Sequence, residues 1–194
     1  MPSMVIHDRR LSGQTPAYYN FVMQVNDKTS IHHIVEVVAR RARQVRKLDR
    51  LHILCHGYEG HSDLGSGMTI PTAHGGFGLQ LGREGLNLFN YGLTSRWKGL
   101  VDEIVVFACA PAETYQGNIG TRADGRRFCG YLALTTGARV IAGQDTQYYN
   151  DTSGPIDFGA WEGPVFEFSD TNPEGSRILD PSSYRVQRDR ASAA

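Results

Sequence analysis

The sequence predicts an α/β protein with a mainly parallel central sheet, flanked by helices in three layers. Three apolar runs carry this prediction: LHIL at 51–54, IVVF at 104–107 and ARVIAG at 138–143. Uninterrupted runs of this length are typical of strands that are buried on both faces of a parallel sheet. Enough chain separates each run from the next for a helical crossover, which in parallel sheets has a right-handed sense.

We expect one domain over residues 1–170, because a chain of 194 residues can form one substantial core. From residue 171 to residue 194 periodicity is absent, and Pro, Ser and Arg are frequent. This composition predicts an extended or disordered tail.

Local patterns predict the other elements. Three short strands are expected at 4–7, at 21–25, which would lie at an edge of the sheet, and at 165–168. The clearest helix lies within 27–49, where Thr29 or Ser30 can cap the start and apolar residues recur on one face. Basic residues crowd its second half, which we expect to be a solvated face, with an anion-binding patch as the alternative. A second helix is expected between Asp124 and Gly137.

The middle of the chain is expected to hold a short strand at 79–81 and a broken helix over 84–97. Four residues of this helix are expected to face inward: Leu86, Phe89, Leu93 and Trp97. The preceding glycine-rich loop, 58–78, contains two histidines and is long for a connector. Because loops of this length in compact domains are usually functional or mobile, we expect it to form one wall of a substrate site.

Charge and cysteine content narrow the function classes. The 20 basic and 20 acidic side chains cancel, so no overall field favours nucleic acid or a membrane surface as a partner. The apolar runs are too short to span a bilayer, and no secretory signal is visible. Three widely spaced cysteines, Cys55, Cys109 and Cys129, do not resemble a disulfide framework. We therefore expect a cytoplasmic protein, with signal-independent export as the alternative, and predict no oligomeric state.

Two of the predicted strands end in residues that carry chemistry. His56 follows the run 51–54, and Cys109 follows the run 104–107, with Pro111 forcing the chain out of the sheet soon afterwards. Ligands of open α/β sheets bind at the carboxyl ends of strands. If the two strands are parallel neighbours, the imidazole and the thiol project from the same edge.

This pair has the composition of a nucleophile and its base. A thiolate is the attacking form of cysteine, so Cys109 requires a nearby base, which His56 can supply. An acyl carbonyl attacked by the thiolate also requires donors for its oxyanion, and the backbone N–H groups of Gly57 and Cys109 are candidates. Such chemistry requires no cofactor and no metal. The strand at 138–143 ends on the same edge, which makes Gln144 and Asp145 candidate substrate-binding residues.

The two blocks LHILCHG and IVVFACA resemble those of the caspase-like cysteine peptidases of clan CD, in which one apolar block ends in His-Gly and a second ends in Ala-Cys. The similarity continues more weakly through FCGYLALTTGARVIAG and covers roughly residues 30–168, in the manner of bacterial members. Phe107 stands where caspases themselves have Gln. The resemblance implies a caspase-like fold and cleavage of peptide or protein substrates by a His56–Cys109 dyad. Asp145 would then favour a basic substrate residue.

Three alternatives stay open at this stage. Cys55, His56 and His61, with His52 or His74, are ligand types that zinc accepts, although Cys55 and His56 point to opposite faces of a strand. A related amidase or acyl-transfer enzyme would use the same dyad. A catalytically idle binding module would keep the fold without the activity.

Overall fold

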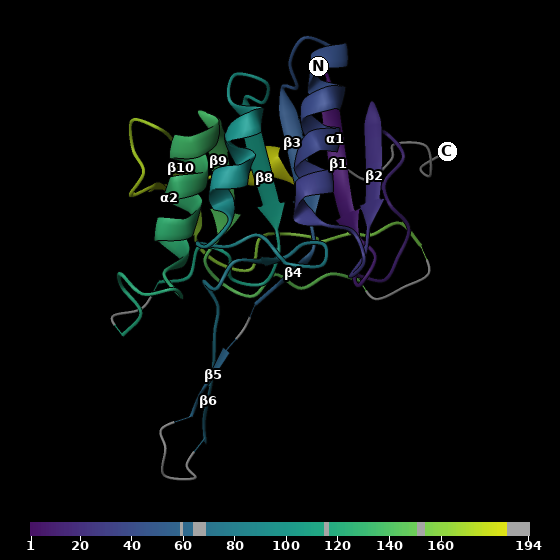
Figure 1. Cartoon of the computed structure of the whole chain (residues 1–194). Helices are drawn as coiled ribbons and strands as arrows, with labels where there is room; N and C mark the ends of the chain where they lie inside the picture. The colour runs from purple at the N-terminus through teal and green to yellow at the C-terminus, as the bar shows by residue number, and fades with distance from the viewer. Residues whose placement is uncertain (59, 64–68, 115–116, 151–153, 186–194) are drawn as a thin grey trace.

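The computed structural model describes residues 1–58, 60–63, 69–114, 117–150 and 154–185. Its centre is a seven-stranded sheet with the strand order β11-β10-β9-β8-β3-β1-β2 (Figure 1). The strands are β1 (Ser3–Asp8), β2 (Phe21–Val25), β3 (Arg50–Leu54), β8 (Glu103–Phe107), β9 (Arg139–Gly143), β10 (Val165–Phe168) and β11 (Ser176–Ile178). The five strands from β9 to β2 run parallel, whereas β10 pairs antiparallel with both β9 and β11. The protein is therefore α/β with a mixed, mainly parallel sheet.

The expected adjacency of the two central strands is confirmed. β3 and β8 pair in parallel register, from Leu51 beside Ile104 to Leu54 beside Phe107. The pairing continues past the end of β3, because the Cys55 N–H donates to the Phe107 carbonyl at 3.1 Å. Both strands are buried on both faces, as uninterrupted apolar runs predict. The two chain segments therefore leave the sheet side by side.

Both predicted helices form, with the expected caps. Helix α1 (Ile31–Gln44) begins after Ser30, whose side chain accepts a hydrogen bond from the backbone N–H of His33. Helix α2 (Gly125–Thr136) begins after Asp124 and ends at Gly137, which has the left-handed φ of 67° that favours glycine. The caps fix where each crossover connection turns back towards the sheet.

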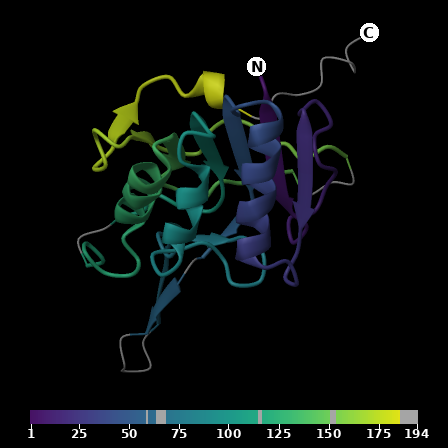
Figure 2. The ribbon, with the colours of Figure 1, turned by 45° about the horizontal axis from the view of Figure 1, so that its top comes forward.

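All the longer helices lie on one face of the sheet (Figures 1 and 2). α1, α2 and the 3₁₀ helix η1 (Tyr91–Trp97) contribute their buried hydrophobic side chains to a single core cluster against this face. The opposite face, with Val105 and Phe107, is instead covered by aromatic residues of irregular segments, among them Tyr19, Phe158 and Trp161. Of the described residues on that side, only η2 (Ser182–Tyr184) is helical.

The expectation of helices on both faces is thus wrong for the second face. Large aromatic side chains supply its apolar cover: the ring of Trp161 stacks on that of Phe107 with centroids 4.5 Å apart. Segments without regular structure can bury a sheet face in this way when their aromatic residues reach it.

Two further expectations need correction. In the stretch 84–97 only η1 is helical; Leu86 and Trp97 are buried as predicted, but Phe89 is 71% exposed and Leu93 is 38% exposed. Asparagine side chains hold the first part in turns, since the Asn90 carboxamide accepts from the Asn87 N–H. Trp97 anchors the second part by donating from Nε1 to the Val35 carbonyl at 3.0 Å.

The predicted tail is the other correction. Within it, β11 pairs antiparallel with β10 and completes the sheet, so the chain beyond residue 170 adds an edge strand. Residues 186–194 lie outside the described part. Loop closure by Gly175, which has a positive φ of 79°, permits this return to the sheet.

The region expected as a long loop, 58–78, holds one small strand pair, in which β5 (Gly60–Asp63) pairs antiparallel with β6 (Thr69–His74). On either side of it, β4 (His56–Gly57) pairs antiparallel with β7 (Leu79–Gln80), and β7 confirms the short strand predicted at 79–81. The β5–β6 pair projects from the carboxyl edge of the sheet, away from the body of the molecule (Figure 1). Among the described residues, no helix has the length and apolar content needed to cross a bilayer.

Candidate active site

The carboxyl ends of the parallel strands bring the predicted site residues to one edge of the sheet. His56 follows β3, Cys109 follows β8, and Gln144 and Asp145 follow β9, which pairs in parallel with β8. His56 and Cys109 are both half-buried. The topology therefore collects all the predicted site residues from three consecutive strands of the sheet.

Gly57 lies directly against the backbone of Cys109. A Cβ atom on Gly57 would come within 1.9 Å of the Cys109 carbonyl oxygen and within 3.1 Å of its Cα. Real Cβ atoms do not approach backbone atoms this closely, so only glycine allows the two segments to meet. The His-Gly and Ala-Cys blocks, which are 53 residues apart in the sequence, are in van der Waals contact here.

The turn after Cys109 is held from three directions. Ala110 has a φ of 46°, a left-handed conformation that is uncommon for a residue with a side chain. Its N–H donates to the Asp145 carbonyl at 3.1 Å, and its carbonyl accepts from the Gly76 N–H at 2.9 Å. Ala112 donates to the Gly143 carbonyl at 3.0 Å. Unfavourable backbone conformations of this kind cost about 1–3 kcal/mol and persist only where the surroundings impose them.

His56 is oriented by the loop that follows β1. Its Nε2 atom lies 3.3 Å from the carbonyl oxygen of Arg10. A carbonyl can only accept, so this contact requires the proton on Nε2 and leaves the lone pair on Nδ1. The ring also meets that of Tyr149 edge to face, with centroids 6.3 Å apart. The neutral imidazole thus presents Nδ1 as its basic atom.

The loop that supplies this carbonyl is clamped by a buried ion pair. Asp8, at the end of β1, is fully buried and accepts two hydrogen bonds from the Arg10 guanidinium, at 2.9 and 2.6 Å. The guanidinium also donates to the carbonyls of Gln80 and Gly82, and this ion pair raises the pKa of Arg10. Asp8 accepts a further bond from the Gly82 N–H. Arg10 therefore ties β1, β7 and His56 together.

Asp8 and Arg10 were not among the site residues predicted from the sequence, although one signal for Asp8 was present. Asp8 is the last residue of the apolar strand β1, one register position before the level at which His56 and Cys109 follow β3 and β8. All parallel strands of a sheet end at one edge, so Asp8 could have been assigned to the site from its position alone.

The two predicted substrate-binding residues differ in their surroundings. Asp145 is exposed, its carboxylate lies against the backbone of Gly163, and no ion pair engages it among the described residues. Gln144 is half-buried, and its side chain accepts a 3.5 Å hydrogen bond from Arg126. Asp145 is thus available to a ligand at this edge, whereas Gln144 is turned towards α2.

The other two cysteines are buried. The Cys55 side chain is 1% exposed, and burial raises the pKa of its thiol well above the usual value. Burial likewise raises the pKa of Cys129, whose Sγ donates to the Pro111 carbonyl at 3.6 Å. None of the three thiols forms a disulfide. Cys55 also follows a strand at this edge, but Cys109 is the only one of the three cysteines that is not fully buried.

Zinc binding was the alternative use of these residue types. Among the described residues, no three His, Cys, Asp or Glu side chains are placed to share a metal ion. The side chains of His61 and His74 lie outside the described part.

No protein-family model, curated protein or solved structure matches the chain.

Proposed function

We propose that the protein is a cysteine peptidase of caspase-like type, in which His56 and Cys109 form the catalytic dyad. The observation that carries this proposal is the backbone contact between Gly57 and Cys109 at the carboxyl ends of two adjacent parallel strands. It puts an imidazole and a half-buried thiol on one rim, with the histidine tautomer fixed by the Arg10 carbonyl.

The chemistry follows from the positions of these groups. Nδ1 of His56 takes the proton of the Cys109 thiol, and the thiolate attacks the carbonyl carbon of the peptide bond. The backbone N–H groups of Gly57 and Cys109 stabilise the resulting oxyanion. The C–N bond then breaks as Nδ1 returns the proton to the leaving amine. Water, deprotonated by Nδ1, hydrolyses the thioester and restores the thiol.

The residues that follow β9 would set the substrate preference. The exposed carboxylate of Asp145 has no ion-pair partner among the described residues and lies at the same edge as Cys109. An exposed anion at this position favours a substrate with Lys or Arg next to the scissile bond. The interpretation of Gln144 as a substrate-binding residue has less support, because Arg126 already engages it.

Cleavage of a peptide library tests the proposal. The purified chain is expected to cut peptides after basic residues, and Cys109→Ala and His56→Ala are each expected to abolish the cleavage. Hydrolysis of small amides without any peptide cleavage would favour the amidase, and the absence of turnover on both substrate classes would favour the idle binding module. Cys129→Ala removes a buried thiol of α2 that is not part of the proposed dyad, and it controls for nonspecific effects of losing a thiol.

A further inference from the structure

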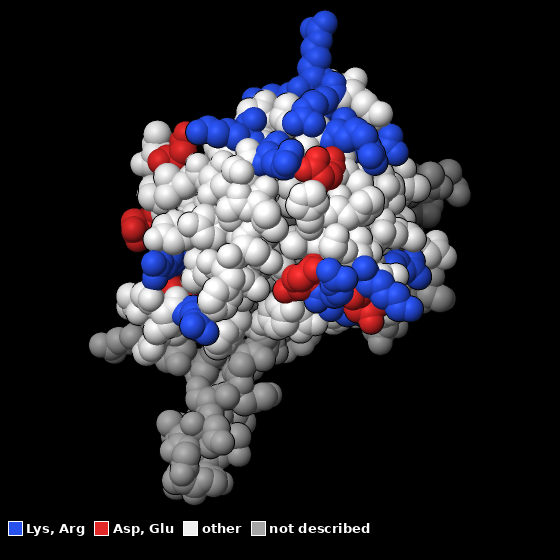
Figure 3. Space-filling model, viewed as in Figure 1, with Lys and Arg blue, Asp and Glu red and all other residues white. Residues whose placement is uncertain are grey.

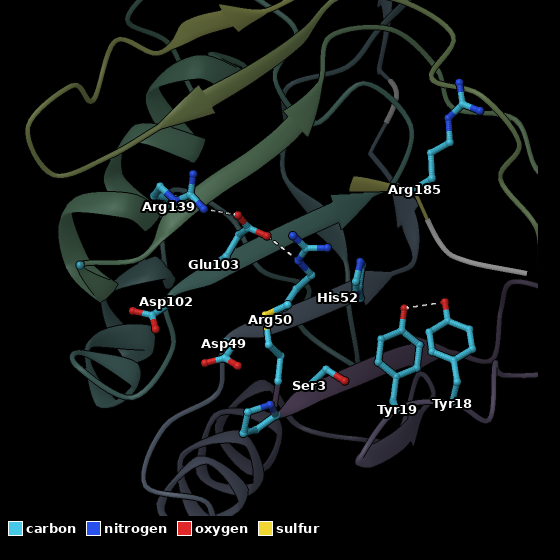
Figure 4. Close-up of a pocket in the computed structure, with 13 residues that line it drawn as sticks. Ser3, Tyr18, Tyr19, Asp49, Arg50, His52, Asp102, Glu103, Arg139 and Arg185 are labelled. Atoms are coloured by element: carbon cyan, nitrogen blue, oxygen red, sulfur yellow. Dashed lines mark hydrogen bonds and ion pairs between the residues drawn. The ribbon is translucent and has the colours of Figure 1, made fainter. Parts of the chain in front are cut away.

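A second pocket lies at the opposite edge of the sheet, where the parallel strands begin. It has a volume of about 880 Å³ and is lined by the first residues of β1, β3, β8 and β9, which are Ser3, Arg50, Glu103 and Arg139 (Figure 4). This volume is within the range of about 300–1,000 Å³ that is typical of small-molecule sites. None of the residues proposed for the dyad lines it.

The charged groups at the floor of the pocket are already paired. The Glu103 side chain is 3% exposed and lies between two guanidinium groups, with one oxygen bonded to Arg50 and the other 2.5 Å from Arg139. Arg139 also pairs with Glu167 at 3.1 Å. This arrangement fixes the guanidinium of Arg50 in place, so that its position is set before any ligand arrives.

His52 is the exception among the buried polar groups of the pocket. It is 4% exposed, and within the part of the chain that the structure describes neither of its ring nitrogens has a hydrogen-bond partner. The contrast with His7 is direct: that histidine is equally buried, but its Nδ1 lies 2.7 Å from the Thr15 hydroxyl and its Nε2 lies 3.2 Å from the Leu11 carbonyl. A buried polar group without a partner is unusual in a protein, and one that lines a pocket points to a ligand.

Aromatic rings and further donors surround His52. The ring of Tyr19 meets that of His52 edge to face, with centroids 5.2 Å apart, and Tyr18 stacks on Tyr19 at 4.4 Å. Figure 4 shows the His52 ring between the guanidinium of Arg50 and the hydroxyl ends of the two tyrosines. Tyr18 donates to the Tyr19 hydroxyl at 3.1 Å, so the proton of Tyr19 is left to donate elsewhere. Flat rings and hydrogen-bond donors therefore converge on one space.

The surroundings of the pocket carry positive charge. Lys and Arg side chains gather at the end of the molecule where α1 ends and the strands begin (Figure 3). Arg40, Arg43 and Arg46 are exposed there, and the guanidinium of Arg185 at the pocket rim forms no ion pair or hydrogen bond with the described residues. The lining also includes Asp49 and Asp102, of which Asp102 pairs with Lys47. The exposed arginines around the pocket nevertheless favour an anionic ligand over a cationic one.

We propose that this pocket binds a small molecule that combines a flat aromatic or heteroaromatic ring with a phosphate or carboxylate group. The ring lies beside Tyr18 and Tyr19, its polar edge is hydrogen-bonded by His52, and the anionic group faces Arg185. A nucleoside monophosphate and an aromatic carboxylate share this chemistry. The site is independent of the dyad at the other edge, so either proposal can fail alone.

Titration of the full chain with AMP, UMP and nicotinate tests this site, with calorimetry for affinity and the ¹⁵N signals of the His52 imidazole as the local readout. We expect at least one probe to bind with a Kd below about 1 mM and to shift the His52 signals. Binding of the nucleotides alone would assign a phosphate ligand, and binding of nicotinate alone a carboxylate. Failure of all three to bind up to ~10 mM would overturn the proposal.

Two variants connect the binding to this pocket. His52→Phe keeps the ring and removes both nitrogens, and Arg185→Ala removes an exposed cation, so its fold is not at risk. Each is expected to weaken binding by about tenfold or more. Arg177→Ala, an exposed arginine that does not line the pocket, is the matched control and should bind normally. If His52→Phe and Arg185→Ala bound the probe as tightly as the control and the unaltered chain do, the ligand would lie elsewhere and the assignment would be refuted.

Discussion

Replacing Gly57 by alanine should damage both stability and reactivity, because the added Cβ meets the Cys109 backbone. The built Cβ lies 1.9 Å from the Cys109 carbonyl oxygen, whereas ordinary contacts begin at 3.4 Å, so the two segments must separate by roughly 1.5 Å. Overpacking of this kind typically costs about 1–3 kcal/mol of unfolding free energy. A displacement of about 1 Å in catalytic groups can cost ~10²-fold in rate. Denaturant unfolding and the rate of Cys109 alkylation measure the two effects.

Gly92→Ala is the matched control, since a Cβ there has nothing within 4 Å. It should change the unfolding free energy by no more than about 0.5 kcal/mol and leave the alkylation rate unchanged. If Gly57→Ala behaved like Gly92→Ala in both assays, the close contact between the two strand ends would be wrong. If Gly57→Ala lost stability but kept the normal alkylation rate, the contact would support the fold without affecting the reactivity of Cys109.

Three further predictions concern the surroundings of the two sites. Arg10→Met should lower the rate of Cys109 alkylation by about tenfold, because the loop whose carbonyl orients His56 loses its clamp; a normal rate would contradict that positioning role. Asp145→Asn should weaken cleavage after Lys and Arg by roughly 1 kcal/mol in kcat/KM, while cleavage after neutral residues is kept, and an equal loss on both would count against the assigned preference. Burial lowers the pKa of His52 from 6.5 to about 3. The burial of its neutral ring therefore contributes fully to the free energy of unfolding above pH 6.5, and this contribution should fall by about 1.4 kcal/mol per pH unit as the pH drops towards 3. Unfolding curves of His52→Phe should lack this part of the slope, and identical slopes would show that His52 is not buried in its neutral form.

The sheet was predictable from the sequence because its strands are short apolar runs. Uninterrupted or alternating apolar residues correctly predicted the positions of four strands: β3, β8, β9 and β10. The starts of α1 and α2 were predictable from Ser30 and Asp124, since a side chain that accepts from the first helical turn is a strong local signal. These features depend on neighbouring residues and need no knowledge of the tertiary structure.

The parts that escaped prediction depend on contacts between distant segments. β11 has two exposed residues of three and is a strand only because β10 offers it an edge. Similarly, nothing near Trp161 indicates that its ring covers Phe107 in place of a helix. The clamp of Asp8 by Arg10 forms next to the site only because β1 and β3 are neighbours.

The same distinction applies to the candidate site. His56, Gly57 and Cys109 were found because each follows an apolar strand, and their convergence required only that the strands be parallel neighbours. The role of the Arg10 carbonyl has no sequence signature, since every residue has a carbonyl. The sequence indicated His52 only as a possible zinc ligand, and only the structure shows that both of its ring nitrogens lack a hydrogen-bond partner among the described residues.

Alkylation of the three cysteines by an iodoacetamide probe, read by mass spectrometry, tests the proposed dyad most directly. Cys55 and Cys129 provide internal references, because burial raises the pKa of both thiols. Near neutral pH, Cys109 should react much faster than either, and His56→Ala should remove that advantage. Slow labelling of all three thiols, unchanged by His56→Ala, would contradict an activated His56–Cys109 pair.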